Sequence, residues 1–172
     1  IPSGIFHTKA INLIGNGVVI DPIIFTKEIQ DLEPYKINFN KKLLISKKAH
    51  LILPTHRILD AASEALKGKR KIGSTLKGIG PAYMDKTGRN GIRIGDILAP
   101  NWENKYKHLC QKHLSMLKSY NTSIEYDLKN LENNFFSSIE TLRKFKLVDS
   151  EQYLTEEQKK GNLDRYGFKE SM

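Results

Sequence analysis

The sequence predicts an α/β fold that carries a helical subdomain. Up to about residue 68, short β-branched or apolar runs alternate with helical patterns, and two long helical stripes follow after residue 100. Strands mixed with helices, and then helices alone, are typical of an α/β piece with a helical addition. The chain has 172 residues, which is enough for one domain with a real core.

The first elements are two strands and a helix. Residues 11–20 form two β-branched runs around a Gly-Asn-Gly turn, which predicts two short strands. Asp21 is a suitable N-cap and Pro22 suits the first helical position, so a helix is expected from there to about Leu32. Pro34 ends this helix because its ring cannot continue the hydrogen-bond ladder.

Further strands and a second helix follow. Residues 42–46 form a compact apolar run that predicts a buried strand, and residues 51–53 form another short run. Pro54 and Thr55 begin a helix with apolar residues at helical spacing. Gly68 ends that helix in the C-cap position.

Two amphipathic stripes predict two long helices after residue 100. The first stripe is Trp102, Tyr106, Leu109, His113 and Leu117. The second stripe is Ile124, Leu128, Leu131, Phe135, Ile139 and Leu142. Capping residues at 121–123 lie between them, so the helices are expected to pack as an antiparallel pair. We expect His56 and His113 at the core edge or the surface, and Cys110 as a small apolar filler.

Composition and charge narrow the function classes. The single cysteine excludes an internal disulfide and favours a reducing compartment, so a cytoplasmic location is expected. No apolar run is long enough for a transmembrane helix, and residues 1–4 do not read as a signal peptide. The formal net charge of +9 favours anionic partners, either nucleic acid or phosphorylated small molecules.

Cations and glycines gather in one segment, residues 67–93. It holds eight cations against one acid, Asp85, together with five glycines between residues 73 and 91. Glycine lets backbone N–H groups approach an anion without a Cβ in the way, and Ser74 and Thr75 add hydroxyl donors. These are the ingredients of a phosphate cradle, and a flexible solvated loop has the same composition.

Two standard phosphate motifs fail in this segment. Gly73 and Gly78 have P-loop spacing, but Ile79-Gly80 stands where that motif has Lys followed by Ser or Thr. The run from Gly78 begins like a dinucleotide fingerprint, but it lacks the third glycine, and Pro81 disfavours a helix through it. The five histidines show no ligand spacing with cysteine or paired acids, so no metal site is expected in the chain.

A longer motif in the same segment is specific. Residues 78–89 match every fixed position of the adenylosuccinate synthetase signature, and the chain therefore resembles that family. The matching positions are Gly78, Ile79, Gly80, Pro81, Tyr83, Lys86 and Arg89. Flanking runs also resemble the family, at residues 1–5, 14–19 and 91–96. The resemblance extends to about residue 150.

This resemblance implies an enzyme of de novo AMP and purine nucleotide biosynthesis, a ligase that forms a C–N bond. The family uses GTP and Mg²⁺ to phosphorylate O6 of IMP, and L-aspartate then displaces that phosphate to give adenylosuccinate. The resemblance also implies part of a P-loop-like parallel or mixed sheet and a homodimer. Neither nucleic acid nor a membrane is expected as a partner.

The resemblance assigns roles within the segment. Ser74 and Thr75 match a hydroxyl pair that binds IMP, and Thr75 is expected to hydrogen-bond the 5′-phosphate. Arg89 matches an arginine that reaches across the dimer to the other subunit's IMP. Lys86 matches the active-site lysine of the signature. It is expected to support the site electrostatically rather than act as the base, with plain stabilisation of the loop as the alternative.

The resemblance covers less than half of the family's length, and the chain does not begin with Met, so we expect a fragment. The family's catalytic loop, Mg²⁺ ligands and guanine-recognition motif are expected outside it, so the isolated chain should be inactive. Its expected parts are a partial α/β core at 1–98 with the IMP-phosphate loop at 71–96, a helical subdomain at 99–148, and a polar tail at 149–172 that departs from the family.

The alternative function is a basic module that binds nucleotides or nucleic acid without catalysis. Such a module is expected to have aromatic residues for base stacking within its basic cluster, and Tyr83 is the only one there.

Overall fold

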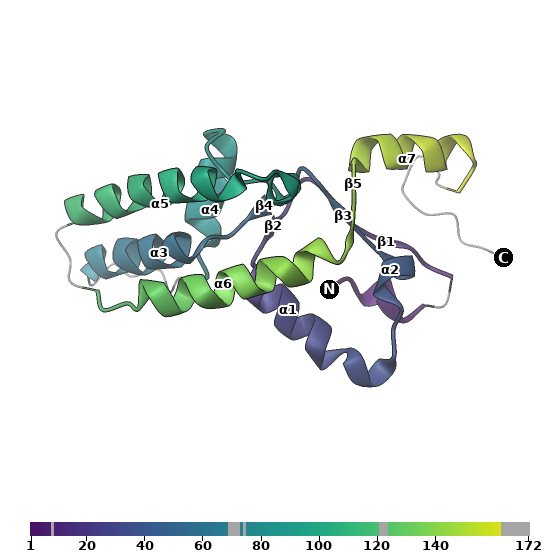
Figure 1. Ribbon diagram of the computed structural model, residues 1–172, viewed down its shortest axis with the longest axis horizontal. Helices are drawn as coiled ribbons and strands as arrows, with labels where there is room; N and C mark the ends of the chain where they lie inside the picture. The colour runs from purple at the N-terminus through teal and green to yellow at the C-terminus, as the bar shows by residue number, and fades with distance from the viewer. Residues whose placement is uncertain (8, 69–72, 74, 121–123, 163–172) are drawn as a thin grey trace.

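The structure, a computed structural model, describes residues 1–7, 9–68, 73, 75–120 and 124–162. Within these ranges parallel strands are flanked by helices, and the predicted α/β fold is confirmed (Figure 1). None of the helices described there is both long enough and apolar enough to cross a membrane.

The described part of the chain contains two small parallel sheets. Their strands are β1 (Asn12–Ile14), β2 (Val19–Ile20), β3 (Leu43–Ser46), β4 (His50–Leu51) and β5 (Lys146–Val148). The first sheet has the order β1-β3-β5, and Ile45 lies opposite Ile14 on one side and Leu147 on the other. The second sheet pairs β2 with β4. The strands around the Gly-Asn-Gly turn therefore exist, but each pairs with a later strand and they do not pair with each other.

The predicted helices are present. The helical elements are α1 (Pro22–Asp31), α2 (Phe39–Lys42), α3 (Pro54–Leu66), α4 (Ile79–Thr87), α5 (Trp102–Ser119), α6 (Leu128–Arg143) and α7 (Ser150–Lys159), with 3-10 turns η1 (Ser3–Phe6), η2 (Glu33–Tyr35) and η4 (Ile94–Leu98). The Asp21 side chain accepts hydrogen bonds from the backbone N–H groups of Ile23 and Ile24, as its N-cap position predicts. Gly68 has a φ of 52°, which is the left-handed conformation expected just after α3.

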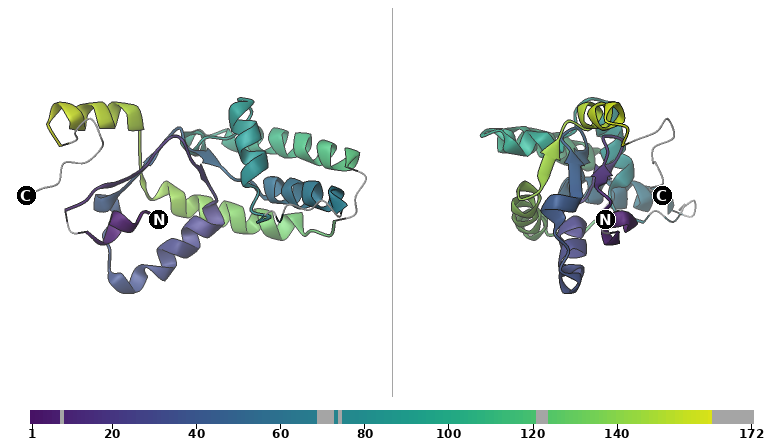
Figure 2. Two further views of the ribbon diagram at one scale, coloured as in Figure 1. Left: turned by 180° about the vertical axis from the view of Figure 1, so that it is seen from behind. Right: turned by 90° about the vertical axis from the view of Figure 1, so that its right-hand side faces the viewer.

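Helices and strands share one core. All four residues of β3 are buried, and the apolar cluster around it includes side chains from α1, α5 and α6. α5 and α6 run in opposite directions with α3 beside both (Figure 1). The rings of Tyr106 on α5 and Phe135 on α6 stack with 5.3 Å between their centroids. Figure 2 shows α7 at the opposite end of the molecule from the tips of α3 and α5.

The glycine-rich segment differs from the loop that the sequence predicts. Residues 79–87 form α4, and Pro81 lies in its first turn. The first backbone N–H groups of a helix have no partner within the helix, so a proline there removes no hydrogen bond. The prediction that Pro81 disfavours a helix through it was therefore wrong, because α4 begins just before the proline and continues past it.

Candidate functional site

The N-terminal end of α4 is pressed against α3 at Gly78. This residue has a φ of 74°, and its N–H donates to Asp60 Oδ2 at 2.9 Å. A Cβ added at Gly78 would lie 2.8 Å from the backbone nitrogen of Arg57 and 2.8 Å from the carbonyl carbon of His56. Both the backbone angle and the close approach of α3 therefore require glycine at the first position of the signature.

The C-terminal end of α4 presents Arg89 in an unusual conformation. The N–H of Asn90 donates to the carbonyl of Asp85 at 2.9 Å, and the N–H of Arg89 donates to the carbonyl of Lys86 at 3.3 Å. These two bonds form a Schellman motif, in which the residue at the Arg89 position is left-handed and is usually glycine. Arg89 has a φ of 60° and an exposed side chain. Non-glycine residues held in this region often occur at functional sites.

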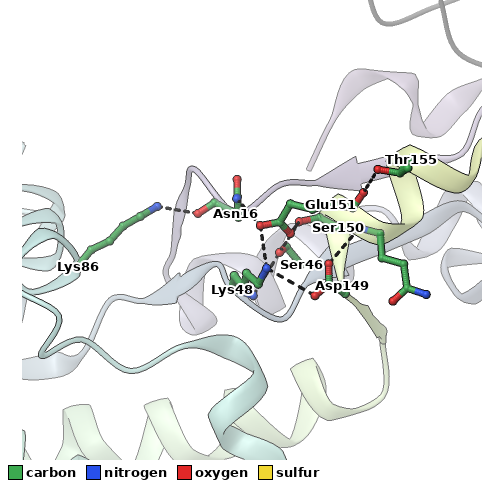
Figure 3. A network of polar contacts seen from close by, with 9 residues as sticks. Asn16, Ser46, Lys48, Lys86, Asp149, Ser150, Glu151 and Thr155 are labelled. Carbon is green, nitrogen blue, oxygen red and sulfur yellow. Dashed lines mark hydrogen bonds and ion pairs between the residues drawn. The ribbon is translucent and has the colours of Figure 1, made fainter. Parts of the chain in front are cut away.

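Two signature side chains hold the Gly-Asn-Gly turn, residues 15–17, which follows β1. The Tyr83 hydroxyl donates to the carbonyl of Gly17 at 3.1 Å. Lys86 Nζ donates to the carbonyl of Asn16 at 2.7 Å, as Figure 3 shows. The Lys86 ammonium also lies 5.5 Å from the centre of the Tyr83 ring. Burial lowers the pKa of Lys86 from its ordinary value. α4 and the turn therefore form one unit.

The opposite side of the turn is held by the start of α7. Asn16 Nδ2 donates to Glu151 Oε1 at 2.9 Å, and Lys48 Nζ donates to the same oxygen at 2.9 Å (Figure 3). These bonds from Lys48 and neighbouring groups lower the pKa of Glu151 to about 2. Below them, the buried hydroxyls of Ser46 and Ser150 lie 2.8 Å apart. All these groups follow the carboxyl ends of β1, β3 and β5, the edge where α/β proteins usually bind ligands.

A buried polar cluster lies on the α3 and α5 side of α4. Asp85 Oδ2 accepts from His56 Nε2 at 2.9 Å and from His113 Nε2 at 2.7 Å. His56 and His113 are 1% and 2% exposed, so the prediction that they lie at the core edge or the surface was wrong. Lys112 Nζ lies 3.4 Å from the other carboxylate oxygen. Burial opposes ionisation of Asp85, but the two imidazole hydrogen bonds outweigh it and hold its pKa below the usual range.

The pattern of hydrogen-bond donors and acceptors in this cluster fits imidazole N–H groups that donate to Asp85 better than it fits a bound metal ion. The Leu53 backbone N–H donates to His56 Nδ1 at 3.0 Å, so the proton of a neutral His56 is on Nε2 and points at Asp85. Burial lowers the pKa of His56, which favours this neutral form. Coordination would need the Nε2 lone pair. Mg²⁺ in addition prefers oxygen ligands in an octahedral shell, and one carboxylate beside two imidazoles does not fit it.

The loop before α4 is partly described. Buried Glu64 accepts from Lys67 Nζ at 2.9 Å and from the N–H of Gly73 at 2.8 Å. Thr75 is exposed, whereas Ser74 lies outside the described residues. Thr75 and Arg89 are thus placed beyond opposite ends of α4, and Lys86 faces the Gly-Asn-Gly turn.

The sequence interpretation missed the roles of five residues of this site: Asn16, His56, Asp85, His113 and Glu151. One signal was available, because Asp85 is the only acid among eight cations in residues 67–93. Such an isolated acid inside a basic segment indicates a specific partner. The contact between Asn16 and Glu151 carried no comparable signal, since the two residues are 135 positions apart in the chain.

Comparison with known proteins finds a family and a matching fold. The family model described as adenylosuccinate synthetase matches residues 1–163, which is beyond the expected end of the resemblance near residue 150. The chain is 60% identical over 161 residues to an adenylosuccinate synthetase of Flavobacterium johnsoniae and 57% identical over 151 residues to one of Bacteroides fragilis. These matches cover 94% and 88% of this chain but 38% and 35% of the relatives.

A solved structure has the same fold. The fully ligated adenylosuccinate synthetase of Plasmodium falciparum superposes with a TM-score of 0.75 and 29% identity. The match covers 92% of this chain and 36% of that structure. The chain therefore spans little more than a third of the length of the proteins that it resembles.

Proposed function

The chain belongs to the adenylosuccinate synthetase family. From this premise we propose that its residues bind the 5′-phosphate of IMP in a GTP-dependent ligase. The reaction joins IMP and L-aspartate into adenylosuccinate, with Mg²⁺ bound by residues other than those described here. The observation that carries the proposal is Arg89, an exposed cation held at a φ of 60° where glycine is usual. The planar, permanently charged guanidinium of arginine suits a phosphate dianion.

Thr75 and Arg89 are proposed to serve different subunits of a homodimer. The nine residues of α4 lie between them, and at 1.5 Å per residue this helix alone is about 13 Å long. That separation is larger than one phosphate group. The positions support a division in which Thr75 binds the IMP of its own subunit and Arg89 binds the IMP of the other.

Lys86 is proposed to support the site rather than to act as the base. Its ammonium donates to the carbonyl of Asn16, and its neighbour Tyr83 donates to the carbonyl of Gly17. Both signature side chains therefore shape the ligand-binding edge of the sheet. This arrangement supports a cation that fixes the turn and adds positive potential near a bound phosphate.

Calorimetry with IMP and with inosine, which lacks the phosphate, tests the proposal. IMP should bind and inosine should not. Arg89→Leu should weaken IMP binding by at least about tenfold, because a hydrogen bond to a charged group contributes about 1.5–3 kcal/mol. Lys129→Leu, an exposed cation on α6, is the matched control and should leave binding unchanged. Equal binding of inosine and IMP would contradict the proposal, and oligonucleotide binding with a steep salt dependence would favour a nucleic-acid module.

Mixing two defective chains tests the division between subunits. Thr75→Ala alone and Arg89→Leu alone should each weaken IMP binding at every site. In an equal mixture, random pairing into dimers should restore about a quarter of the sites, because each mixed dimer has one site with both groups intact. No recovery in a mixture that does form dimers would refute the assignment of Arg89 to the other subunit.

A further inference from the structure

Asp85 is the point at which three helices meet. Its carboxylate on α4 contacts His56 on α3 and His113 on α5, and all three residues are buried. Each imidazole is itself oriented by a neighbour. The N–H of Leu53 donates to His56 Nδ1 at 3.0 Å, and Thr55 Oγ1 lies 2.7 Å from His113 Nδ1.

The backbone of Asp85 performs a second task at the end of α4. Its carbonyl accepts from the N–H of Asn90 at 2.9 Å and from the N–H of Gly91 at 3.1 Å. These two hydrogen bonds close the turn that contains Arg89, whose backbone has a left-handed conformation. The next residue along the chain, Lys86, holds the Gly-Asn-Gly turn through the carbonyl of Asn16. Asp85 thus connects its buried contacts with the two histidines to both signature cations, Lys86 and Arg89.

We propose that Asp85 is a positioning residue for phosphate binding by Arg89 and Lys86. Its carboxylate fixes the rotation of α4 about its own axis relative to α3 and α5. This rotation determines where the side chains of Arg89 and Lys86 lie. The two imidazoles hold the carboxylate from separate helices, so α4 cannot turn without breaking a buried hydrogen bond. The proposal rests on the proposed function for its ligand, while the anchoring itself is independent of any ligand.

Amide hydrogen exchange and IMP calorimetry on the whole chain test this role. Asp85→Ala removes the carboxylate, and Asp85→Asn keeps its shape and one oxygen that can accept both imidazole N–H groups. The amides of Asn90 and Gly91 should exchange at least about tenfold faster in Asp85→Ala and less so in Asp85→Asn. IMP affinity should fall in the same order. The matched control is Asp127→Ala, which removes the N-cap carboxylate of α6 and should change neither readout.

Each outcome decides the proposal. Unchanged exchange at Asn90 and Gly91 in both Asp85 variants would overturn it, and so would a loss of IMP affinity no greater than that of the control. Partial recovery of both readouts in Asp85→Asn supports it and separates positioning from a general loss of stability. If the unsubstituted chain binds no IMP, the proposed function fails, and the exchange measurements alone decide whether Asp85 holds this end of α4.

Discussion

Two glycines of the signature should respond oppositely to alanine. Gly78 has a φ of 74°, and a Cβ there would lie 2.8 Å from backbone atoms of α3. Gly80, two residues later, lies inside the first turn of α4 and has no atom within 4 Å of an added Cβ. Gly78→Ala should therefore destabilise the chain, whereas Gly80→Ala should stabilise it.

The magnitudes follow from two terms for Gly78 and one for Gly80. A left-handed alanine costs about 1–2 kcal/mol, and forcing a methyl group against rigid backbone typically costs about 1–3 kcal/mol. Gly78→Ala should thus lower the free energy of unfolding by about 2–5 kcal/mol. At Gly80 the higher helix propensity of alanine should raise it by up to about 1 kcal/mol.

Urea unfolding followed by fluorescence measures both changes. Trp102 is the single tryptophan and is 4% exposed, so its emission reports loss of the core. With a slope of about 2 kcal/mol per molar urea, the midpoint for Gly78→Ala should fall by roughly 1–2.5 M. Equal shifts for the two variants, or a loss below about 0.5 kcal/mol at Gly78, would refute the reasoning.

Three further outcomes are expected. Arg89→Gly should raise the free energy of unfolding by up to about 1 kcal/mol, because glycine adopts the left-handed angle without strain, and in calorimetry it should weaken IMP binding by at least about tenfold. Stability should fall as pH drops below about 6.5, because burial lowers the folded-state pKa of His56 and the unfolded chain takes up the proton first. It should fall again below about pH 4, because the folded-state pKa of Asp85 lies below its usual range, and urea titrations at several pH values measure both steps. Lys86→Met should lower the free energy of unfolding by about 0.5–1.5 kcal/mol through loss of its hydrogen bond to the turn, whereas Lys118→Met, at an exposed position of α5, should change it little.

The sequence by itself determined the features that depend on near neighbours. The N-cap at Asp21 and the C-terminal glycine at position 68 were predicted correctly, since their hydrogen bonds and backbone angles involve residues a few positions away. The stripe of Phe135, Ile139 and Leu142 was also correct, because burial of a helix face follows the helical period, although its predicted first member, Ile124, lies before the start of α6. The signature at residues 78–89 identified the family for the same reason, as a local pattern of residue types.

Only the tertiary structure decided which distant residues meet. The sequence predicted two strands around the Gly-Asn-Gly turn but not their partners: β1 pairs with β3, and β2 pairs with β4. His56, Asp85 and His113 come from three helices, and nothing in their spacing along the chain indicated one buried cluster. Sheet partners and buried polar contacts depend on how whole elements pack, and that packing is a property of the entire core rather than of any local segment.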